Sequence, residues 1–339
     1  MKIPATVVTG FLGAGKTTLI RSLLEKANGV RIALIINEFG DLGVDRELLA
    51  GCGIESCKDD DIIELANGCI CCTVADDFLP VMENLINRAD PPDHIVIETS
   101  GLALPKPLIK AFHWPEVRAR VTVDGVIAVV DGPAFASGAF DEDAPPSAQT
   151  LKNGHDDNPL EEVFTDQIMA ADMVLLNKSD LMDDATRADA ERALGARARP
   201  GVHILATARG NVDRRVLLGL DAGAEDDLDQ RPSHHDDGDH DHDDFDTFAL
   251  TLGSIGALDR LEAALGDIAR DHGVLRIKGF VDVPGKDMRH VVQGVGPRID
   301  RYFDRPWKAG EARQSTLVFI GEKGFDRDAV AAALEAALG

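Results

Sequence analysis

The chain has 339 residues, of which 59 are Asp or Glu and 35 are Lys or Arg, so its formal net charge at pH 7 is −24. A nucleic-acid-binding protein needs a basic face, so this charge argues against a nucleic-acid partner. The longest apolar runs, Val126–Val130 and Ile32–Ile36, have the length of strands and are too short to cross a membrane. We expect no targeting leader, because Met1-Lys2-Ile3 leads directly into a predicted strand. We therefore expect a cytoplasmic protein without a membrane partner, long enough for one large and one small domain.

Apolar runs alternate with amphipathic stretches through the first two-thirds of the chain. The predicted strands are Ala5–Thr9, Ile32–Asn37, His94–Glu98, Gly125–Asp131, Met173–Asn177 and Val202–Ala206. The predicted helices are Lys16–Lys26, Pro107–Phe112, Leu160–Ala171 and Asp184–Ala196. Strands rich in β-branched residues and separated by helices are typical of a parallel sheet that is buried on both faces. The sequence therefore predicts an α/β fold, with a mostly parallel sheet flanked by helices, over residues 1–224.

Two polar segments interrupt this pattern. Ser137–Pro159 is rich in Asp, Pro, Gly and Asn, and we interpret it as a surface insertion. Glu225–Asp244 ends in a run of His, Asp and Gly that contains no apolar residue, so we predict a disordered linker over residues 225–244. Residues 245–339 would then form a small C-terminal α+β domain. Its predicted elements are Phe245–Leu252, Ala257–Asp271, Val274–Val283, Met288–Val295, Ser315–Ile320 and Asp326–Leu338.

A phosphate-binding loop follows the first predicted strand. Residues 10–17, with the sequence GFLGAGKT, match the pattern G-x-x-x-x-G-K-[ST] between a strand and a helix, the context in which this motif is specific. Its glycines let backbone N–H groups converge on phosphate oxygens at a helix N-terminus. Lys16 supplies a positive charge to the β- and γ-phosphates, and Thr17 offers a hydroxyl to Mg²⁺. The predicted nucleotide-binding residues here are Gly10, Gly13, Ala14, Gly15, Lys16, Thr17 and Thr18.

The base is indicated by the sequence Asn177-Lys178-Ser179-Asp180, which follows a predicted strand and resembles the N-K-x-D element of GTPases. A carboxylate at Asp180 can accept hydrogen bonds from the ring N–H and the exocyclic amine of guanine, and adenine lacks this pair of donors. The element on its own is weak, but downstream of a phosphate loop it indicates GTP. The backbone of residues 206–208 is a further candidate for supporting the base.

The predicted strand His94–Glu98 ends in an acid and continues as Thr-Ser-Gly101. P-loop enzymes place a second Mg²⁺-associated carboxylate and a γ-phosphate sensor at this point in the fold. We predict that Glu98 is the carboxylate and that Gly101 is the sensor. Together with Lys16, they form the predicted catalytic group. The alternative is a glutamate at the end of a strand without a ligand.

Three of the five cysteines are clustered in Cys69-Ile70-Cys71-Cys72. An odd number of cysteines with this clustering does not suit a disulfide framework. Three thiolates can bind one soft or borderline cation, and imidazole, carboxylate or water can complete the tetrahedron. A helix predicted to begin near Thr73–Phe78, limited by Pro80, would favour the thiolates through its N-terminus. Buried small hydrophobes and a redox dithiol are the alternatives, and the spacing favours a metal.

Other metal-binding side chains are less specific. Glu38, in Asn37-Glu38-Phe39-Gly40, ends a predicted strand where GTPase switch segments lie and is a candidate fourth ligand. Contact with Mg²⁺ and a purely structural role are its alternatives. Cys52 and Cys57 are interpreted as residues that bind no metal. His234–Asp244 has metal-binding side chains without a fixed geometry, and we interpret it as a solvated linker.

These motifs in combination resemble the CobW family of P-loop metallochaperone GTPases. The likeness covers nearly the whole chain and includes the His/Asp-rich linker before a small C-terminal domain. Stretches typical of the family are Val8–Thr18 and Ile36–Gly40. Those that resemble its members linked to cobalamin biosynthesis are Glu98–Leu108, Trp114–Arg118, Gly279–Phe280, Val291–Pro297 and Tyr302–Trp307.

The resemblance implies a slow GTPase that delivers Co²⁺ to the cobalt chelatase of aerobic cobalamin biosynthesis, or to another metalloprotein client. We expect Mg²⁺–GTP to order the segments carrying Glu38 and Cys69–Cys72 so that they hold the metal, and hydrolysis to release it. Thiolates suit Zn²⁺ as well, so the ligands alone do not select cobalt. The alternatives are a zinc chaperone or metalloenzyme activator of the same family, and a His-rich metal store whose P-loop has lost its function.

Overall fold

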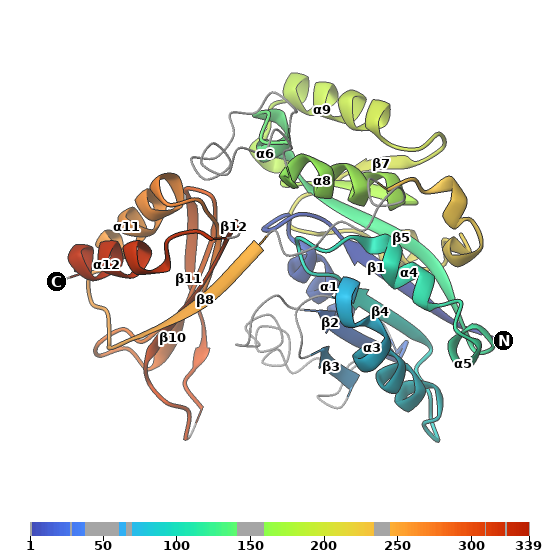
Figure 1. Ribbon diagram of the computed structural model, residues 1–339, viewed down its shortest axis with the longest axis horizontal. Helices are drawn as coiled ribbons and strands as arrows, with labels where there is room; N and C mark the ends of the chain where they lie inside the picture. Colours follow the sequence, from blue (N-terminus) through green and yellow to red (C-terminus); the bar gives the residue numbers. More distant parts are fainter. Residues whose placement is uncertain are drawn as a thin grey trace. The chain divides into compact units, whose positions relative to one another are not determined.

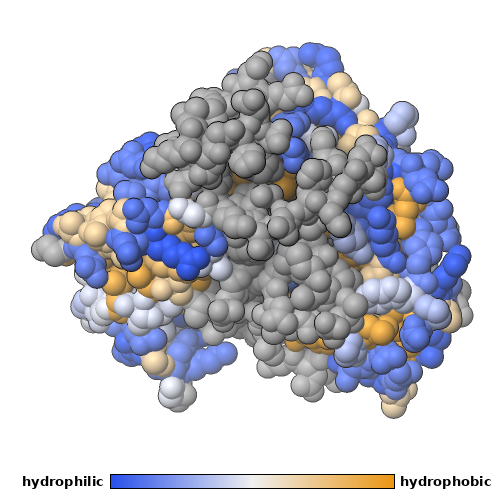
Figure 2. All heavy atoms as spheres, viewed as in Figure 1, coloured by the Kyte–Doolittle hydropathy of each residue, from blue (hydrophilic) through white to orange (hydrophobic). Residues whose placement is uncertain are grey.

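The computed structural model describes residues 2–27, 29–37, 61–65, 70–140, 159–233, 245–308, 310–322 and 324–338. These residues fall into two compact units, one extending to residue 233 and the other beginning at residue 245. Among them, no helix combines the length and the apolar character needed to cross a lipid bilayer. On the face of the molecule drawn in Figure 2, hydrophobic residues of the described surface lie in scattered areas among hydrophilic ones.

The first unit is built on a parallel sheet of seven strands in the order β3-β2-β4-β1-β5-β6-β7 (Figure 1). The strands are β1 (Ile3–Thr9), β2 (Ile32–Asn37), β3 (Ile62–Leu65), β4 (His94–Glu98), β5 (Val121–Asp131), β6 (Met173–Asn177) and β7 (His203–Ala206). Each adjacent pair is parallel, so the carboxyl ends of all seven strands meet at one edge of the sheet. The predicted α/β fold is confirmed.

Helices cover both faces of this sheet. They are α1 (Lys16–Glu25), α3 (Ile70–Ile86), α4 (Pro105–Ala111), α5 (Pro115–Arg118), α6 (Gly132–Ala136), α8 (Pro159–Ala170), α9 (Asp184–Arg197) and α10 (Arg214–Leu217). Successive strand residues point to opposite faces. Thus Val7 packs with Phe78 of α3 and Leu108 of α4, whereas Val8 packs with Leu19 and Leu23 of α1. Burial of both faces explains why the strands are continuous apolar runs.

The first unit differs from the predicted elements at β3 and at the start of α3. The short strand β3 was not predicted, because its four residues, IIEL, lie next to polar sequence on both sides. Helix α3 begins at Ile70 rather than near Thr73–Phe78, and Pro80 lies inside it. A proline inside a helix removes one backbone hydrogen bond. Phe78 and Met82 on the same helix are fully buried, and this packing offsets the loss.

The predicted linker begins too early at residue 225. The short 3₁₀ helices η3 (Ala224–Asp226) and η4 (Leu228–Gln230) pack on the first unit. Glu225 is buried and accepts hydrogen bonds from the Thr122 hydroxyl at 2.7 Å and the Val123 backbone N–H at 2.8 Å. The fully buried Arg231 donates to Asp172 at 2.7 Å. Residues 225–233 therefore belong to the first unit, and the predicted boundary at residue 224 is wrong, whereas His234–Asp244 lies outside the described residues.

The second unit is an antiparallel sheet of five strands in the order β11-β10-β9-β12-β8 (Figure 1). The strands are β8 (Phe245–Leu252), β9 (Val274–Val281), β10 (Met288–Val295), β11 (Arg298–Pro306) and β12 (Ser315–Glu322), and the helices are α11 (Leu258–Asp271) and α12 (Arg327–Leu338). Leu265 of α11 and Leu334 of α12 share one core with Leu317 and Phe319 of β12. The predicted α+β architecture is confirmed, with β11 as the missed strand because its residues are mostly charged.

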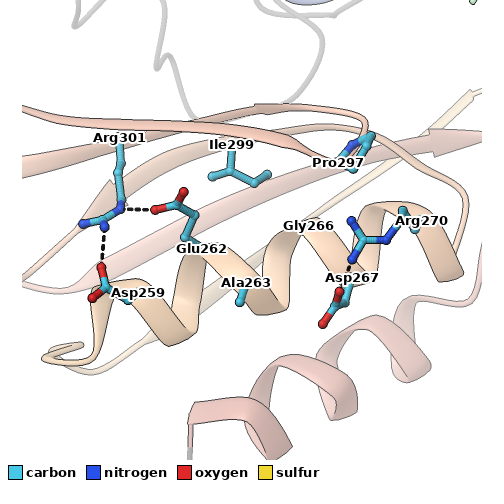
Figure 3. A pocket seen from close by; sticks show the side chains of 9 residues that line it. All are labelled: Asp259, Glu262, Ala263, Gly266, Asp267, Arg270, Pro297, Ile299 and Arg301. Atoms are coloured by element: carbon cyan, nitrogen blue, oxygen red, sulfur yellow. Dashed lines mark hydrogen bonds and ion pairs between the residues drawn. The ribbon is translucent and has the colours of Figure 1, made fainter.

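An open groove of about 570 Å³ lies between α11 and β11. Figure 3 shows its charged side chains joined to one another: Arg301 donates to Glu262 and to Asp259, both at 2.5 Å, and Arg270 pairs with Asp267. Because these groups satisfy one another at the surface, we assign the groove no ligand.

Candidate functional site

The phosphate loop connects β1 to α1 with a backbone that requires glycine at two points. Gly10 has φ = 136°, and a Cβ there would overlap the Val129 carbonyl oxygen. Gly15 has φ = 104°, and a Cβ there would overlap the side-chain amide of Asn177. Residues with a Cβ rarely adopt such φ angles. Glycine at these two positions therefore lets the loop lie directly against β5 and the end of β6. This is the backbone shape predicted for a phosphate cradle.

Lys16 begins α1 at the end of this loop. Its side chain is 5% exposed and folds back to donate to the carbonyl oxygens of Gly10 at 2.7 Å and Phe11 at 3.3 Å. Gly15 is the N-cap residue of the helix and makes no side-chain capping hydrogen bond. A helix N-terminus with an adjacent ammonium group is an anion site. The loop can therefore exchange its internal lysine contacts for phosphate oxygens.

Thr17 and Glu98 meet at the carboxyl edge of the sheet. The Thr17 hydroxyl donates to Glu98 Oε1 at 2.9 Å, and Glu98 is 3% exposed. The sequence predicts that both residues associate with Mg²⁺, and the structure brings them together although they are far apart in the chain. A hydroxyl and a carboxylate are hard oxygen ligands of the kind that bind Mg²⁺ beside a nucleotide, so the residues fit this ion.

The turn after β4 lies directly against the phosphate loop. A Cβ on Gly101 would come within 2.9 Å of the Leu12 backbone nitrogen. Ala103 N–H donates to the Ser100 carbonyl at 3.2 Å and closes the turn. A backbone so close to the loop can respond to the presence of a γ-phosphate, which is the role predicted for Gly101.

The turn is held from behind by Gln167 of α8, a residue that sequence reasoning missed. Its side-chain nitrogen donates to the carbonyl oxygens of Gly101 and Ala103, both at 3.2 Å, and the residue is 1% exposed. Carbonyl oxygens only accept hydrogen bonds, so the nitrogen of the Gln167 amide, and not its oxygen, must face the turn. No local motif marks this residue, because its partners lie more than sixty positions away in the chain.

The predicted base-recognition segment is attached to the phosphate loop. Asn177 Nδ2 donates to the Ala14 carbonyl at 2.8 Å, and its Oδ1 accepts from Gly210 N–H at 3.1 Å. Lys178 adopts φ = 60° and donates to Asp131 Oδ2 at 2.8 Å. Asp131, at the end of β5, is therefore a second supporting residue that the sequence did not single out.

Asp180 lies in the 3₁₀ turn η2 (Ser179–Leu181) and is exposed. Ser179 Oγ donates to the Thr207 carbonyl at 2.9 Å, which joins this turn to the segment predicted to support the base. An exposed carboxylate beside these loops is available to a purine edge. The assignment of Asp180 to guanine stays a prediction.

The metal-binding residues are only partly within the described structure. Cys71 and Cys72 lie in the first turn of α3, for which the backbone is described, and Cys69 and Glu38 lie outside the described residues. Within the described ranges, no group of three or more His, Cys, Asp or Glu side chains is placed to hold a metal ion. The thiolate site stays a prediction.

Asn37 is the last residue of β2 and directly precedes Glu38. It is 2% exposed, and neither its Nδ2 nor its Oδ1 has a hydrogen-bond partner among the described residues. Buried amides are normally hydrogen-bonded. Asn37 was not predicted as a site residue, because an asparagine at the end of a strand is not a motif.

Comparison with known proteins agrees with this arrangement. The family model described as CobW/HypB/UreG, nucleotide-binding domain, matches residues 4–206. The chain belongs to this family. As a member of the CobW/HypB/UreG family it is a P-loop GTPase, as the sequence predicts. Residues 245–338 match a second model, described as the Cobalamin synthesis protein cobW C-terminal domain.

Two curated relatives of this CobW/HypB/UreG member cover nearly its whole length. It is 52% identical over 347 residues to the zinc chaperone CobW of Sinorhizobium sp, with 99% of this chain and 97% of the relative covered. It is 50% identical over 350 residues to the zinc chaperone CobW of Pseudomonas aeruginosa, with 99% and 92% covered. Among solved structures, the Zn(II)-bound YjiA GTPase from E. coli is 27% identical, with 100% of this chain and 99% of that chain covered and a TM-score of 0.44.

Proposed function

We propose that this GTPase is a transition-metal chaperone, in which bound Mg²⁺–GTP creates a thiolate metal site and hydrolysis releases the metal to a metalloprotein client. Three features support the proposal. The sequence combines a phosphate loop with the triplet Cys69, Cys71 and Cys72, the chain belongs to a family with metal-related members, and relatives at 50% and 52% identity are named zinc chaperones.

The proposal rests on the position of the end of β3, the last described strand before the cysteine triplet. Leu65 ends β3 at the edge where β2 and β4 also end, with Leu65 opposite Asn37. Neighbouring strands lie about 4.8 Å apart, so the end of β3 is about 10 Å from the end of β4 at Glu98. Cys69 follows Leu65 by four residues, which span at most about 14 Å. The length of chain therefore keeps Cys69 close to the edge of the sheet at which Glu98 and the phosphate loop lie.

The nucleotide would be held by Lys16 and the phosphate loop, with Asp180 on the guanine edge. Thr17 and Glu98 would hold Mg²⁺, directly or through water. Mg²⁺ held there would supply positive charge to offset the negative charge of the phosphates. The chain's own contribution is to orient the γ-phosphate against Gly101, whose turn touches the phosphate loop. Loss of the γ-phosphate would release this turn and the switch segments beside it.

We propose Zn²⁺ as the first candidate cargo. Thiolates are good ligands for zinc, and divalent affinities in such sites do not favour cobalt over zinc. The relatives' names point the same way. A helix N-terminus favours the thiolate form of a nearby cysteine, and the backbone of Cys71 and Cys72 lies in the first turn of α3.

Delivery of Co²⁺ to a cobalt chelatase is the second candidate, favoured by the match of residues 245–338 to the cobalamin synthesis domain. A deletion strain separates the two. Loss of cobalamin synthesis with normal growth under zinc limitation supports cobalt, and the reverse supports zinc.

The proposal is tested by titrating Zn²⁺ and Co²⁺ into the full chain with a non-hydrolysable Mg²⁺–GTP analogue, with Mg²⁺–GDP and without nucleotide. We expect the analogue to tighten metal binding by about tenfold or more. Cys69→Ala, Cys71→Ala and Cys72→Ala should each weaken it, and Cys52→Ala, outside the triplet, should not. Equal metal affinity in the three nucleotide states would contradict the proposal.

A further inference from the structure

A buried amide without partners marks the carboxyl end of β2. Asn37 is 2% exposed, and both Nδ2 and Oδ1 are without a hydrogen-bond partner among the described residues. An amide removed from water without compensating hydrogen bonds destabilises the folded protein. A leucine of similar size would avoid this cost. The position is therefore better explained by a polar ligand than by the packing of the resting protein.

Asn37 lies at the edge of the sheet that carries the predicted phosphate and Mg²⁺ sites. In the pairing of β2 with β4, Ile36 lies opposite Glu98. Asn37 and Thr99 are the next residues along these two strands, at the carboxyl edge that carries the phosphate loop. Thr99 in turn donates to Thr9 at 3.1 Å, at the end of β1. The amide is thus one strand away from the carboxylate predicted to associate with Mg²⁺, and two strands from the phosphate loop.

Hydrolysis of GTP needs a side chain that orients the attacking water, and in other GTPases an amide performs this task. A carboxamide suits it because its oxygen accepts from water while its nitrogen donates to a phosphate oxygen. The described turn from Thr99 to Leu104 has no amide side chain. Gln167, behind the turn, already donates to two carbonyl oxygens.

We propose that Asn37 is a catalytic residue that orients the attacking water, with Oδ1 accepting a hydrogen bond from the water and Nδ2 donating to a γ-phosphate oxygen. The water oxygen forms a bond to the γ-phosphorus as the bond from that phosphorus to the β–γ bridging oxygen breaks. The electron pair of the broken bond stays with GDP. The water's proton passes to a phosphate oxygen, and the products are GDP and inorganic phosphate.

The inference deepens the hydrolysis step of the proposed function and rests on it, but not on the identity of the metal. The test uses the full chain with Mg²⁺ and no transition metal. For Asn37→Leu we expect hydrolysis of GTP to fall about 100-fold. Affinities for Mg²⁺–GDP and for a non-hydrolysable GTP analogue should stay within about twofold, since the amide contacts water and only one phosphate oxygen.

Two further readouts separate catalysis from structure. Affinity for GDP with aluminium fluoride, which mimics the transferring phosphoryl group, should fall together with the hydrolysis rate. The melting temperature of nucleotide-free Asn37→Leu should equal or exceed that of the wild type, because an amide without partners has been replaced by an apolar group. The matched control is Thr6→Val, in the middle of β1 and four residues before the phosphate loop. Its buried hydroxyl is bonded to His94 at 2.8 Å, so this variant should melt earlier and hydrolyse GTP normally.

Wild-type hydrolysis by Asn37→Leu would overturn the proposal. So would a lower melting temperature with parallel losses of GDP affinity and hydrolysis, because this pattern indicates a structural role. If the leucine variant does not fold, Asn37→Ala decides the question by the same comparison of hydrolysis with GDP affinity. A wild-type protein whose metal affinity ignores the nucleotide would contradict metal delivery and leave these results unchanged, so the two failures are distinguishable.

Discussion

The side-chain amide of Asn177 donates to the carbonyl oxygen of Ala14 at a distance of 2.8 Å. The same side chain accepts a hydrogen bond from Gly210 N–H at 3.1 Å. The first residue of the predicted base-recognition segment therefore supports the phosphate loop on one side and the loop after β7 on the other. Because Asn177 is 2% exposed, these bonds are shielded from water. The predicted contacts to the guanine and to the phosphates would therefore depend on one hydrogen-bonded unit.

Asn177→Ala should weaken GTP and GDP binding by a similar factor, because neither of the two bonds depends on the γ-phosphate. Leaving the buried Ala14 carbonyl and Gly210 N–H without partners should also lower the free energy of unfolding by about 2–4 kcal/mol. Calorimetric titration with each nucleotide and denaturant unfolding measure both effects. Asn177→Asp keeps the acceptor for Gly210. Its nucleotide affinities and free energy of unfolding should lie between those of Asn177→Ala and the wild type. Undiminished GDP affinity in Asn177→Ala would contradict this account.

Gln167→Leu should selectively reduce the preference for GTP over GDP. The variant removes the side-chain nitrogen that donates to two carbonyl oxygens of the turn carrying Gly101, the predicted γ-phosphate sensor. We expect affinity for a GTP analogue to fall by up to about 30-fold relative to GDP, as two hydrogen bonds of about 1 kcal/mol each are lost.

The matched control for this variant is Thr165→Val on the same helix. Thr165 donates to Glu161 at 2.7 Å within α8 and is not bonded to the turn. Thr165→Val should leave the ratio of the affinities for the GTP analogue and for GDP unchanged. Equal losses for GTP and GDP in Gln167→Leu would show that Gln167 only stabilises the fold.

His94 makes the stability of the protein depend on pH. Burial lowers its pKa from 6.5 to about 4, against the opposing effect of Asp124. The unfolded chain therefore binds a proton between these values while the folded protein does not. Stability is unaffected above pH 6.5 and is lost as the pH falls toward 4, by about 3 kcal/mol in total. Denaturant unfolding from pH 7 to pH 4 should show this loss, and His94→Gln should show a smaller pH dependence. Parallel curves for the two proteins would contradict the assignment.

Arg231 tests whether residues 225–233 belong to the first unit. Its guanidinium is fully buried and pairs with Asp172 at 2.7 Å and Asp227 at 2.6 Å. Arg231→Met leaves two carboxylates without this partner, and we expect a loss of about 3–5 kcal/mol in the free energy of unfolding of that unit. Arg215→Met, at an exposed pair with Asp213, should cost far less. Equal effects of the two substitutions would place Arg231 outside the core.

Motifs made of contiguous residues could be recognised from the sequence alone. The phosphate loop, Glu98 and the segment around Asn177 each follow a buried strand, and the parallel sheet brings them to one edge. Strands β1, β2, β4 and β6 were found because burial on both faces makes them continuous apolar runs. The missed strand β11 is mostly charged, and the missed strand β3 has only four residues.

Supporting residues could not be predicted because their partners are distant in sequence. Gln167 and Gly101 lie on different elements, and no periodicity or spacing connects them. Asn37 is distinguished by the absence of hydrogen bonds within the described structure, which only coordinates can reveal. Residues 225–233 were wrongly assigned to the linker because the local composition around Glu225 is polar. In the structure, the Glu225 carboxylate is buried and hydrogen-bonded to β5.

The central claim is that the triphosphate and the metal are held by one coupled site, and reciprocity tests it most directly. The affinity of the full chain for a non-hydrolysable Mg²⁺–GTP analogue is measured with and without saturating Zn²⁺, and the affinity for Zn²⁺ with and without saturating analogue. Linkage requires the two ratios to be equal. We predict a common factor of about ten or more, which Cys71→Ala reduces to about one. Analogue affinity that does not change when Zn²⁺ is bound would contradict the account.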